Sequence, residues 1–317
     1  MRIAVTGATG FLGGHLVDRL IEDGHTVTVV IRDPARAADF AARGIGVLLG
    51  DLTRPIEPAT TEQVDALVHT AALSSNWGAR AAFLAANVAG TRTALALARL
   101  LGASRFVHIS SPSIYFRFAD QLGIGEDAPL PPPVNAYAES KRAAETIVLG
   151  AADLHPIVLR PRGIYGRGDV ALLPRLIRAA RRGPLPLLRD GRAVTDLTHV
   201  DDVVAAIVAT LGAPLSLEAT AINVSSGEAV PVRSIVERAC RQQDVRPRFR
   251  KLPVGVALGA ARLAEAVNAA LPGRPEPIAT RYSLGVLAYS QTLDISRAAR
   301  LLGWRPSISL DEGLMRL

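Results

Sequence analysis

The sequence predicts an α/β protein in which a doubly wound parallel sheet carries a smaller, mostly helical C-terminal region. Short apolar runs alternate with helical patterns through the first half of the chain, which is typical of parallel βα units. A glycine-rich loop directly follows the first apolar run. After Gly163 the alternation stops, and most of the chain beyond residue 225 has helical or loop-like patterns.

The apolar periodicity gives the expected elements in order along the chain. Strands are expected at 3–5, 27–31, 47–49, 66–69, 106–109 and 157–159, and helices at 12–23, 34–43, 81–101 and 136–149. The apolar run 254–271 is interrupted by Arg262 and Glu265. We therefore expect a buried or lid helix there and no membrane span.

The composition is that of an ordinary globular protein. The chain has 317 residues, of which 49% are hydrophobic and 21% charged, so it can bury a full core. No basic and apolar leader follows Met1, and Cys240 is the single cysteine. We expect a cytoplasmic protein with no disulfide and no metal site.

The net charge of +7 comes almost wholly from arginine, and the arginines are scattered except for one cluster between 175 and 192. We therefore expect no nucleic-acid partner. A solvated helix face is the favoured interpretation of the cluster, and a site for an anionic substrate tail is the alternative.

The glycine loop lies between the first strand and the first helix. Gly7 allows a tight turn, Gly10 lets the backbone approach a pyrophosphate, and Gly13 lets the helix pack close to the strand. The free N–H groups at the helix N-terminus attract phosphate. This context predicts a Rossmann dinucleotide site, although the spacing is G-x-x-G-x-x-G instead of G-x-G-x-x-G. The predicted contacts in the loop are Gly7, Thr9, Gly10, Phe11, Leu12 and Gly13.

The second strand leads into Arg32 and Asp33, where an NAD-selective site places a carboxylate on the ribose 2′-hydroxyl. Arg32 would bind a 2′-phosphate, with Arg36 as a second contact, so NADP(H) is favoured over NAD(H). The alternative is that Asp33 holds the ribose and Arg32 points to solvent. Further cofactor contacts are expected where later strands end, at Asp51, Leu52, Ala71, Ala72 and Pro161.

Tyr137 and Lys141 are one helical turn apart, so they share a face of the predicted helix. A tyrosine ionises near pH ~10, and a nearby ammonium favours its anion. The strand at 106–109 leads into Ser110 and Ser111, at a strand end where open α/β sheets bind ligands. We predict Tyr137 as the acid/base and Ser111 as the group that hydrogen-bonds the reacting oxygen, with Ser110 and Ser113 as rivals.

These motifs together resemble the extended short-chain dehydrogenase/reductase family, which is the NAD-dependent epimerase/dehydratase family. The resemblance runs nearly end to end and includes the segments 87–91, 159–166 and 199–202. It implies hydride transfer at the nicotinamide C4, with Lys141 also binding the nicotinamide ribose and Asn87 supporting the site from a neighbouring helix. It also implies a homodimer formed through helices such as those at 81–101 and 136–149. On this basis 1–163 with about 197–224 is expected to be the Rossmann domain, and 164–196 with 225–317 the substrate-binding cap.

Three positions bear on the branch of the family. Dehydratases follow the catalytic hydroxyl with an Asp-Glu pair, where this chain has Pro112 and Ser113. Nucleotide-sugar epimerases carry an Asn at the position of Gly163 and an Arg at that of Thr195, and both contact the diphosphate. The runs 71–78 and 111–115 instead resemble the 3β-hydroxysteroid dehydrogenase-like branch, which includes bacterial 2-alkyl-3-oxoalkanoate reductases.

We therefore predict an NADP-preferring oxidoreductase that transfers hydride between nicotinamide and a secondary alcohol or ketone. The small-molecule substrate is expected to be largely apolar: a β-keto acid, a steroid-like ketone or a polyketide-type ketone. A redox-neutral nucleotide-sugar 4-epimerase is the alternative, and an NADP-binding sensor without turnover is the third hypothesis. The expected substrate contacts are Trp77, Ser113, Arg162 and Gly163.

Overall fold

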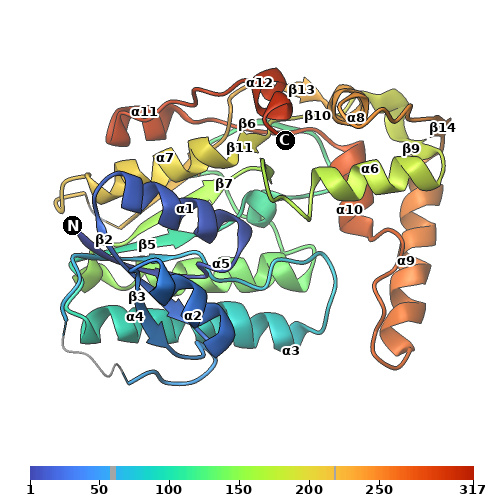
Figure 1. Cartoon of the computed structure of the whole chain (residues 1–317). Coiled ribbons are helices and arrows are strands. Elements are labelled where there is room, and N and C mark those ends of the chain that lie inside the picture. Colours follow the sequence, from blue (N-terminus) through green and yellow to red (C-terminus); the bar gives the residue numbers. More distant parts are fainter. Residues whose placement is uncertain (58–61, 218) are drawn as a thin grey trace.

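A seven-stranded parallel sheet forms the centre of the computed structural model, which describes residues 1–57, 62–217 and 219–317 (Figure 1). The strand order is β12-β7-β5-β4-β1-β2-β3, which confirms the predicted doubly wound sheet. The order reverses direction between β1 and β4, and open sheets of this kind bind ligands at such a point. The strands are β1 (Arg2–Thr6), β2 (Thr26–Ile31), β3 (Gly46–Leu49), β4 (Ala66–His69), β5 (Arg105–Ile109), β7 (Ile157–Pro161) and β12 (Thr220–Val224).

Helices cover both faces of this sheet (Figure 1). One face packs against α1 (Phe11–Glu22), α2 (Pro34–Ala42) and α7 (Val200–Leu211). The other packs against α4 (Gly90–Leu100) and α5 (Ala136–Leu149). Each strand contributes to both cores, because successive side chains point to opposite faces. The strands are therefore mostly apolar, as is usual for a sheet buried on both sides, and polar residues such as His108 of β5 and Arg160 of β7 are buried within them.

The predicted helix at 81–101 is present as three consecutive parts: α3 (Arg80–Phe83), a π-helical turn (Leu84–Ala89) and α4. Residues 80–100 form a helix that is long and apolar enough, by length and composition, to cross a membrane. Of its 18-residue apolar stretch, 44% is buried. A core helix of a soluble protein meets the same criterion. Here the helix lies against α5 and β4, so we assign it to the helical layer of the Rossmann domain.

The region outside the main sheet is mostly helical, as predicted. Its helices are α6 (Leu173–Arg182), α8 (Val232–Arg241), α9 (Val254–Ala270), α10 (Arg281–Ala288), α11 (Ser296–Leu302) and α12 (Leu310–Met315). A small sheet has the order β13-β10-β15-β6, and two further pairs join β8 to β11 and β9 to β14. These strands are β6 (Gln121–Ile124), β8 (Ile164–Tyr165), β9 (Leu185–Leu187), β10 (Val194–Thr195), β11 (Thr198–His199), β13 (Val230–Pro231), β14 (Phe249–Lys251) and β15 (Gln291–Leu293).

Helix α9 forms where a buried or lid helix was expected, but the buried interpretation is wrong. Its small residues Ala257 and Ala261 are buried, while Val256, Leu263 and Val267 are 60%, 68% and 52% exposed. The physical reason is the spacing: the two alanines lie one turn apart and pack with α10 residues in one core cluster, and the larger side chains point elsewhere. The helix stands at the right edge of Figure 1, away from the main sheet.

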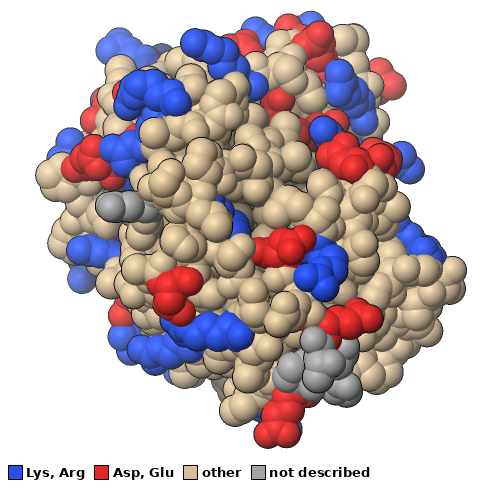
Figure 2. All heavy atoms as spheres, turned by 90° about the vertical axis from the view of Figure 1, so that its left-hand side faces the viewer, with Lys and Arg blue, Asp and Glu red and all other residues tan. Residues whose placement is uncertain are grey.

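The surface charges alternate in sign on the side shown in Figure 2, where acidic side chains lie among the basic ones. In the arginine cluster, Arg175 forms an ion pair with Glu276 at 3.0 Å and Arg189 with Asp120 at 2.7 Å. Helix α6 buries Leu173, Ile177 and Ala180 and exposes all of its arginines. This arrangement supports the solvated-face interpretation of the cluster.

Candidate active site

The glycine loop lies at the carboxyl end of β1 and begins with a left-handed residue, Gly7, at φ +76°. The N–H of Gly10 donates to the carbonyl of Gly7 at 2.9 Å. Gly10 is also the N-cap of α1, and no side chain among the described residues caps the first turn of this helix. A Cβ atom added at Gly13 would lie 2.2 Å from the carbonyl oxygen of Gly7. The loop thus forms a cradle of free N–H groups that fits the pyrophosphate of a dinucleotide.

The other loop residues predicted to bind cofactor differ in what they present. Thr9 is exposed and Phe11 is half-buried. The side chain of Leu12 is buried in the core shared by α1 and α7. Leu12 therefore has only its backbone N–H to offer to a phosphate.

The end of β2 presents a free guanidinium. Asp33 caps α2, since its Oδ1 accepts the N–H of Ala35 at 3.0 Å. Arg36 lies 3.8 Å from Asp39. Arg32 is exposed, and within the described residues its guanidinium has no hydrogen bond or ion pair. Arg32 is therefore the group best placed to receive an anion at this edge.

Two of the predicted cofactor contacts, Asp51 and Leu52, follow β3. Asp51 accepts the N–H and the hydroxyl of Thr53, both at 2.9 Å, and these hydrogen bonds lower the pKa of Asp51. Leu52 packs against the core under α4.

Ala71 and Ala72 follow β4, and the glycine loop passes close to them. A Cβ atom at Gly7 would lie 2.6 Å from the nitrogen of Ala71. Pro161 ends β7 beside Val224 of β12. The predicted cofactor residues thus gather at the carboxyl ends of neighbouring strands.

Helix α5 carries the predicted acid/base pair. Asn135 caps this helix by accepting the N–H of Ala138 at 2.8 Å, which fixes where the helix starts. Tyr137 is half-buried, and its ring lies edge-on to Phe83 with 6.3 Å between centroids. Lys141, one turn later, is only 2% exposed.

Two residues of β5 contact the ammonium group of Lys141. Its Nζ donates to the carbonyl oxygen of Ile109 at 2.6 Å and lies 3.4 Å from Nε2 of His108. Burial lowers the pKa of Lys141 to about 8, and the charge of Glu145 opposes this shift. Glu145 itself pairs with the buried Arg160 of β7.

Three serines follow β5, and the structure distinguishes them. Ser111 is half-buried and its Oγ accepts the N–H of Ser113 at 3.2 Å, so its own proton remains free for a ligand. The hydroxyls of Ser110 and Ser113 are enclosed and have no partner among the described residues. Only Ser111 therefore combines an accessible hydroxyl with a fixed position, and this geometry favours it over its two rivals.

Asn87 lies in the π-helical turn and connects two elements of the site. Its Oδ1 accepts the N–H of Leu73 at 2.7 Å, and its Nδ2 donates to Ser140 Oγ at 2.8 Å and to Leu73 O at 3.1 Å. The side chain thus ties the loop after β4 to α5. π-Helical turns are frequent at functional sites, and this arrangement fits the supporting role that the resemblance implies.

A cavity of about 220 Å³ lies beside Tyr137. A larger recess of about 440 Å³ has a wall between residues 117 and 131 that contains none of the predicted catalytic residues, so we assign the chemistry to the smaller cavity. Trp77, the first of the predicted substrate contacts, lies in its wall and donates its Nε1–H to the carbonyl of Arg274 at 2.9 Å. The wall also contains Phe83, Glu265, Arg281 and Tyr282.

Sequence reasoning missed the contribution of α10. Thr280 caps this helix in a capping box with Ser283, and because threonine is a common N-cap residue it could have predicted the start of the helix. Nothing in the sequence, however, shows that Arg281 and Tyr282 face a tyrosine on another helix. That proximity exists only in the folded chain.

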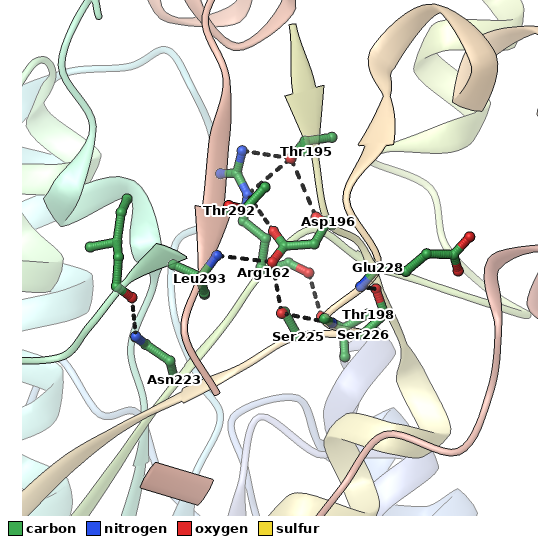
Figure 3. A network of polar contacts seen from close by, with 12 residues as sticks. Arg162, Thr195, Asp196, Thr198, Asn223, Ser225, Ser226, Glu228, Thr292 and Leu293 are labelled. Atoms are coloured by element: carbon green, nitrogen blue, oxygen red, sulfur yellow. Dashed lines mark hydrogen bonds and ion pairs between the residues drawn. The ribbon is translucent and has the colours of Figure 1, made fainter. Parts of the chain in front are cut away.

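Arg162 and Gly163 lie outside the wall of this cavity, and Arg162 belongs to a buried polar network (Figure 3). Arg162 donates to Thr195 Oγ1 through Nε at 3.2 Å and Nη2 at 2.9 Å, and its Nε lies 3.7 Å from Asp196. Asp196 also accepts the hydroxyl of Ser225 at 2.7 Å and the N–H of Leu293 at 3.0 Å. Figure 3 shows these residues converging from the ends of strands in the main sheet and in the small sheet, so Arg162 helps to join the two sheets.

Gly163 is left-handed, at φ +50°, and a Cβ atom there would lie 2.5 Å from Cδ2 of Leu197. The backbone and the packing therefore both favour glycine at this position.

Comparison with known proteins gives consistent matches along the chain. A model of the NAD dependent epimerase/dehydratase family matches residues 3–225. A 2-alkyl-3-oxoalkanoate reductase of Stenotrophomonas maltophilia (strain K279a) is 34% identical and covers 100% of this chain and 98% of that protein. A 4-hydroxy-2-methyl-3-oxo-4-farnesyl-3,4-dihydroquinoline-1-oxide ketoreductase of Stigmatella aurantiaca is 32% identical, over 99% of this chain and 95% of the relative. The solved structure of MoeE5 in complex with UDP-glucose and NAD has a TM-score of 0.75 at 27% identity, covering 100% of this chain and 97% of its own.

Proposed function

Because the chain belongs to the NAD dependent epimerase/dehydratase family, we propose that its site transfers hydride between a nicotinamide cofactor and a ketone or secondary alcohol. The chain is an oxidoreductase, like its ketoreductase relatives. One observation carries this proposal. Tyr137 lies in the wall of a cavity, and Lys141 is buried one turn along the same helix.

The residues of the chain divide the work of ketone reduction. When bound, the reduced nicotinamide supplies the hydride. Tyr137 gives its phenolic proton to the ketone oxygen as the carbonyl carbon is reduced, and it recovers that proton in the reverse, oxidative direction. Ser111 donates a hydrogen bond to the same oxygen. The Lys141 ammonium stabilises the phenolate that forms when Tyr137 gives up its proton.

Replacement of Tyr137 by Phe tests this assignment. The variant retains the ring that packs on Phe83 but has no proton to give, so turnover is expected to fall by at least ~10²-fold, the scale typical of a positioned acid or base. Cofactor binding, measured by fluorescence titration, is expected to stay near the wild-type value. A Tyr137→Phe enzyme of nearly full activity would assign proton transfer to another group.

The cofactor is a nicotinamide dinucleotide, and we infer that NADP(H) is preferred over NAD(H). The support is local: Arg32 is exposed at the end of β2, and Asp33 uses one carboxylate oxygen to cap α2. A free guanidinium suits a 2′-phosphate. Titration of the wild-type protein with NADPH and NADH distinguishes the two cofactors.

The cavity beside Tyr137 supports a largely apolar substrate with an acidic group. Trp77, Phe83 and Tyr282 supply aromatic walls. The Arg281 guanidinium stacks over Phe118 at 5.4 Å and forms no ion pair within the described residues. Glu265, also in the wall, accepts the backbone N–H of Arg281 at 2.7 Å.

We therefore infer that Arg281 binds the carboxylate of a β-keto acid whose alkyl portion contacts the aromatic side chains. The relative from Stenotrophomonas maltophilia is named for the reduction of such acids. The alternative placement, in the cluster at 175–192, is less favourable because Arg175 and Arg189 already have acidic partners. A panel of β-keto acids, their esters, steroid-like ketones and polyketide-type ketones, each followed by NADPH oxidation, tests the substrate class.

Nucleotide-sugar epimerisation is the second candidate, and one observation favours it. The similar structure of MoeE5 holds UDP-glucose together with NAD. One observation argues against epimerisation. Thr195 stands where an epimerase has an arginine, and its hydroxyl oxygen already accepts a hydrogen bond from Arg162. Interconversion of UDP-hexoses without net change of nicotinamide absorbance would establish this candidate. A sensor without turnover ranks third, since both Tyr137 and Lys141 are present.

We also propose that the protein is a cytoplasmic homodimer. The buried free Cys240 is compatible with a reducing compartment. About half of the apolar stretch within residues 80–100 is not buried. The outer side of this helix, together with α5, supplies a surface on which a second copy of the chain could pack. Light scattering of the purified protein measures the oligomeric state.

A further inference from the structure

Two buried histidines lie directly behind the catalytic lysine. His69 of β4 and His108 of β5 are paired in register on neighbouring parallel strands. Each is 1% exposed. Their rings stack with 5.3 Å between centroids and 26° between planes. Imidazoles are polar, so burying two of them beneath an ammonium group calls for a physical reason.

The hydrogen bonds fix the protonation of His69. The Thr91 hydroxyl donates its single proton to the carbonyl of Asn87 at 2.6 Å, so at 3.1 Å its oxygen must accept from Nε2–H of His69. The Thr6 hydroxyl is 2.8 Å from Nδ1 and is therefore the donor there. Burial lowers the pKa of His69 to about 3. His69 is thus neutral, with its proton on Nε2.

His108 is the member of the pair that touches Lys141. An ammonium group can only donate, so Nε2 of His108, 3.4 Å from Nζ, is an acceptor. The ring proton must then be on Nδ1, which is enclosed and has no partner among the described residues. Burial and the charge of Lys141 hold the pKa of His108 well below its usual value. A neutral imidazole therefore faces the ammonium group.

The remaining titratable neighbours come from the elements around this pair. Helix α5 contributes Tyr137 and Glu145, one turn on either side of Lys141, and β4 contributes His69. Glu145 is committed to Arg160 of β7. The Ile109 carbonyl and His108 are therefore the two direct acceptors of the lysine within the described residues.

We propose that His108 is a positioning residue: with the Ile109 carbonyl it occupies two of the three N–H bonds of Lys141 and directs the third toward Tyr137 and the cofactor ribose. This inference rests on the proposed function of the site. An apolar residue in place of His108 would leave the buried ammonium with one acceptor, the Ile109 carbonyl, among the described residues. The charged form of Lys141, on which Tyr137 depends, would be less stable.

The sequence itself makes a direct test available, because the chain has only two lysines, Lys141 and Lys251. Protein labelled with [¹³Cε]lysine should give two side-chain signals by NMR. A Lys251→Arg variant assigns them, since Lys251 is exposed and pairs with Asp190 at the surface. Titration of the remaining signal then measures the pKa of Lys141 in the whole protein, without substrate.

Two replacements of His108 separate hydrogen bonding from packing. His108→Leu fills space without an acceptor and is expected to lower the pKa of Lys141 by about one unit, the loss of one hydrogen bond to a charged group. His108→Gln keeps an oxygen near the position of Nε2 and is expected to retain most of the wild-type pKa. The basic limb of the kcat/KM profile for the preferred ketone should shift with the lysine in the Leu variant only.

An unchanged Lys141 pKa in the Leu variant, or equal shifts in the Leu and Gln variants, would overturn the proposal. Because the NMR titration needs no turnover, its outcome is independent of the proposed function. A wild-type protein that reduces no ketone would refute that function alone. If His108→Leu does not fold, ¹⁵N spectra of the imidazoles in the wild-type protein decide: a His108 proton on Nε2, or a charged ring at neutral pH, would refute the role.

Discussion

Removing the buried charge of Lys141 is expected to change how stability depends on pH. In the folded protein, burial lowers the pKa of this lysine from 10.5 to about 8. A shift of that size corresponds to about 3 kcal/mol, since one pKa unit is ~1.4 kcal/mol. Below about pH 8 the fold bears this cost, because the ammonium is charged in both states but loses its hydration only in the folded one.

The sign follows from proton binding. Between about pH 8 and 10.5 the unfolded chain holds the lysine proton and the folded chain has released it, so the stability of the wild type rises with pH. Lys141→Met keeps the length of the side chain and lacks the titration. It also loses the bond to the Ile109 carbonyl at 2.6 Å, at a cost of ~1 kcal/mol. The unfolding free energy of the variant should therefore equal or exceed that of the wild type near neutral pH and fall below it in strong alkali.

The assay is urea unfolding of both proteins without cofactor, at several pH values from about 7 to about 11, with the difference in unfolding free energy taken at each pH. Titrating groups that lie far from Lys141 behave alike in both proteins and cancel in that difference. Relative to the variant, the unfolding free energy of the wild type should increase by about 3 kcal/mol over this pH range. A difference that stays flat across it would show that Lys141 keeps its ordinary pKa in the fold and would refute the reasoning.

Three further outcomes are expected. Arg32→Ala should weaken NADPH binding by ~1–3 kcal/mol, the loss of a charged hydrogen-bonding partner, and leave NADH binding nearly unchanged; equal wild-type affinities for the two cofactors would contradict this. Arg281→Leu should raise the KM for a β-keto acid ~10-fold and leave that for its methyl ester unchanged, whereas equal effects on acid and ester would exclude carboxylate binding. Gly13→Ala should abolish cofactor binding in calorimetry, because its Cβ would lie 2.2 Å from the Gly7 carbonyl oxygen. Gly14→Ala, with 3.6 Å to its nearest neighbour, is the matched control and should bind as the wild type does.

The parts of the fold that the sequence predicts well are those with local signals. The strand, glycine loop and helix at the N-terminus lie within the first 22 residues, and each feature needs only its neighbours to be recognised. The Tyr137 and Lys141 pair is likewise a matter of one helical turn. The β10 and β13 strands, by contrast, have two residues each, which is too short for a period of two to show.

The parts of the site that the sequence did not predict depend on contacts between distant segments. Arg281 lines the same cavity as Tyr137, and their proximity follows from how α10 packs in the folded chain and not from any local pattern. The stacking of His69 on His108 follows from the strand register, which single strands do not reveal. Helix α9 shows the opposite error: its apolar composition suggested burial, but composition alone does not say which face has a neighbour.

The left-handed turn at Gly163 limits the mutational routes by which this lineage could acquire sugar-nucleotide chemistry. Asparagine tolerates positive φ better than other residues with a Cβ, so the backbone admits it. Its Cβ would nevertheless meet Leu197, which is 9% exposed and has Cδ2 only 2.5 Å away. Leu197 would therefore have to turn its side chain away, or be replaced by a smaller residue, before an asparagine fits. A guanidinium at 195 would in turn displace the hydroxyl that holds Arg162, so these changes are epistatic and their order matters.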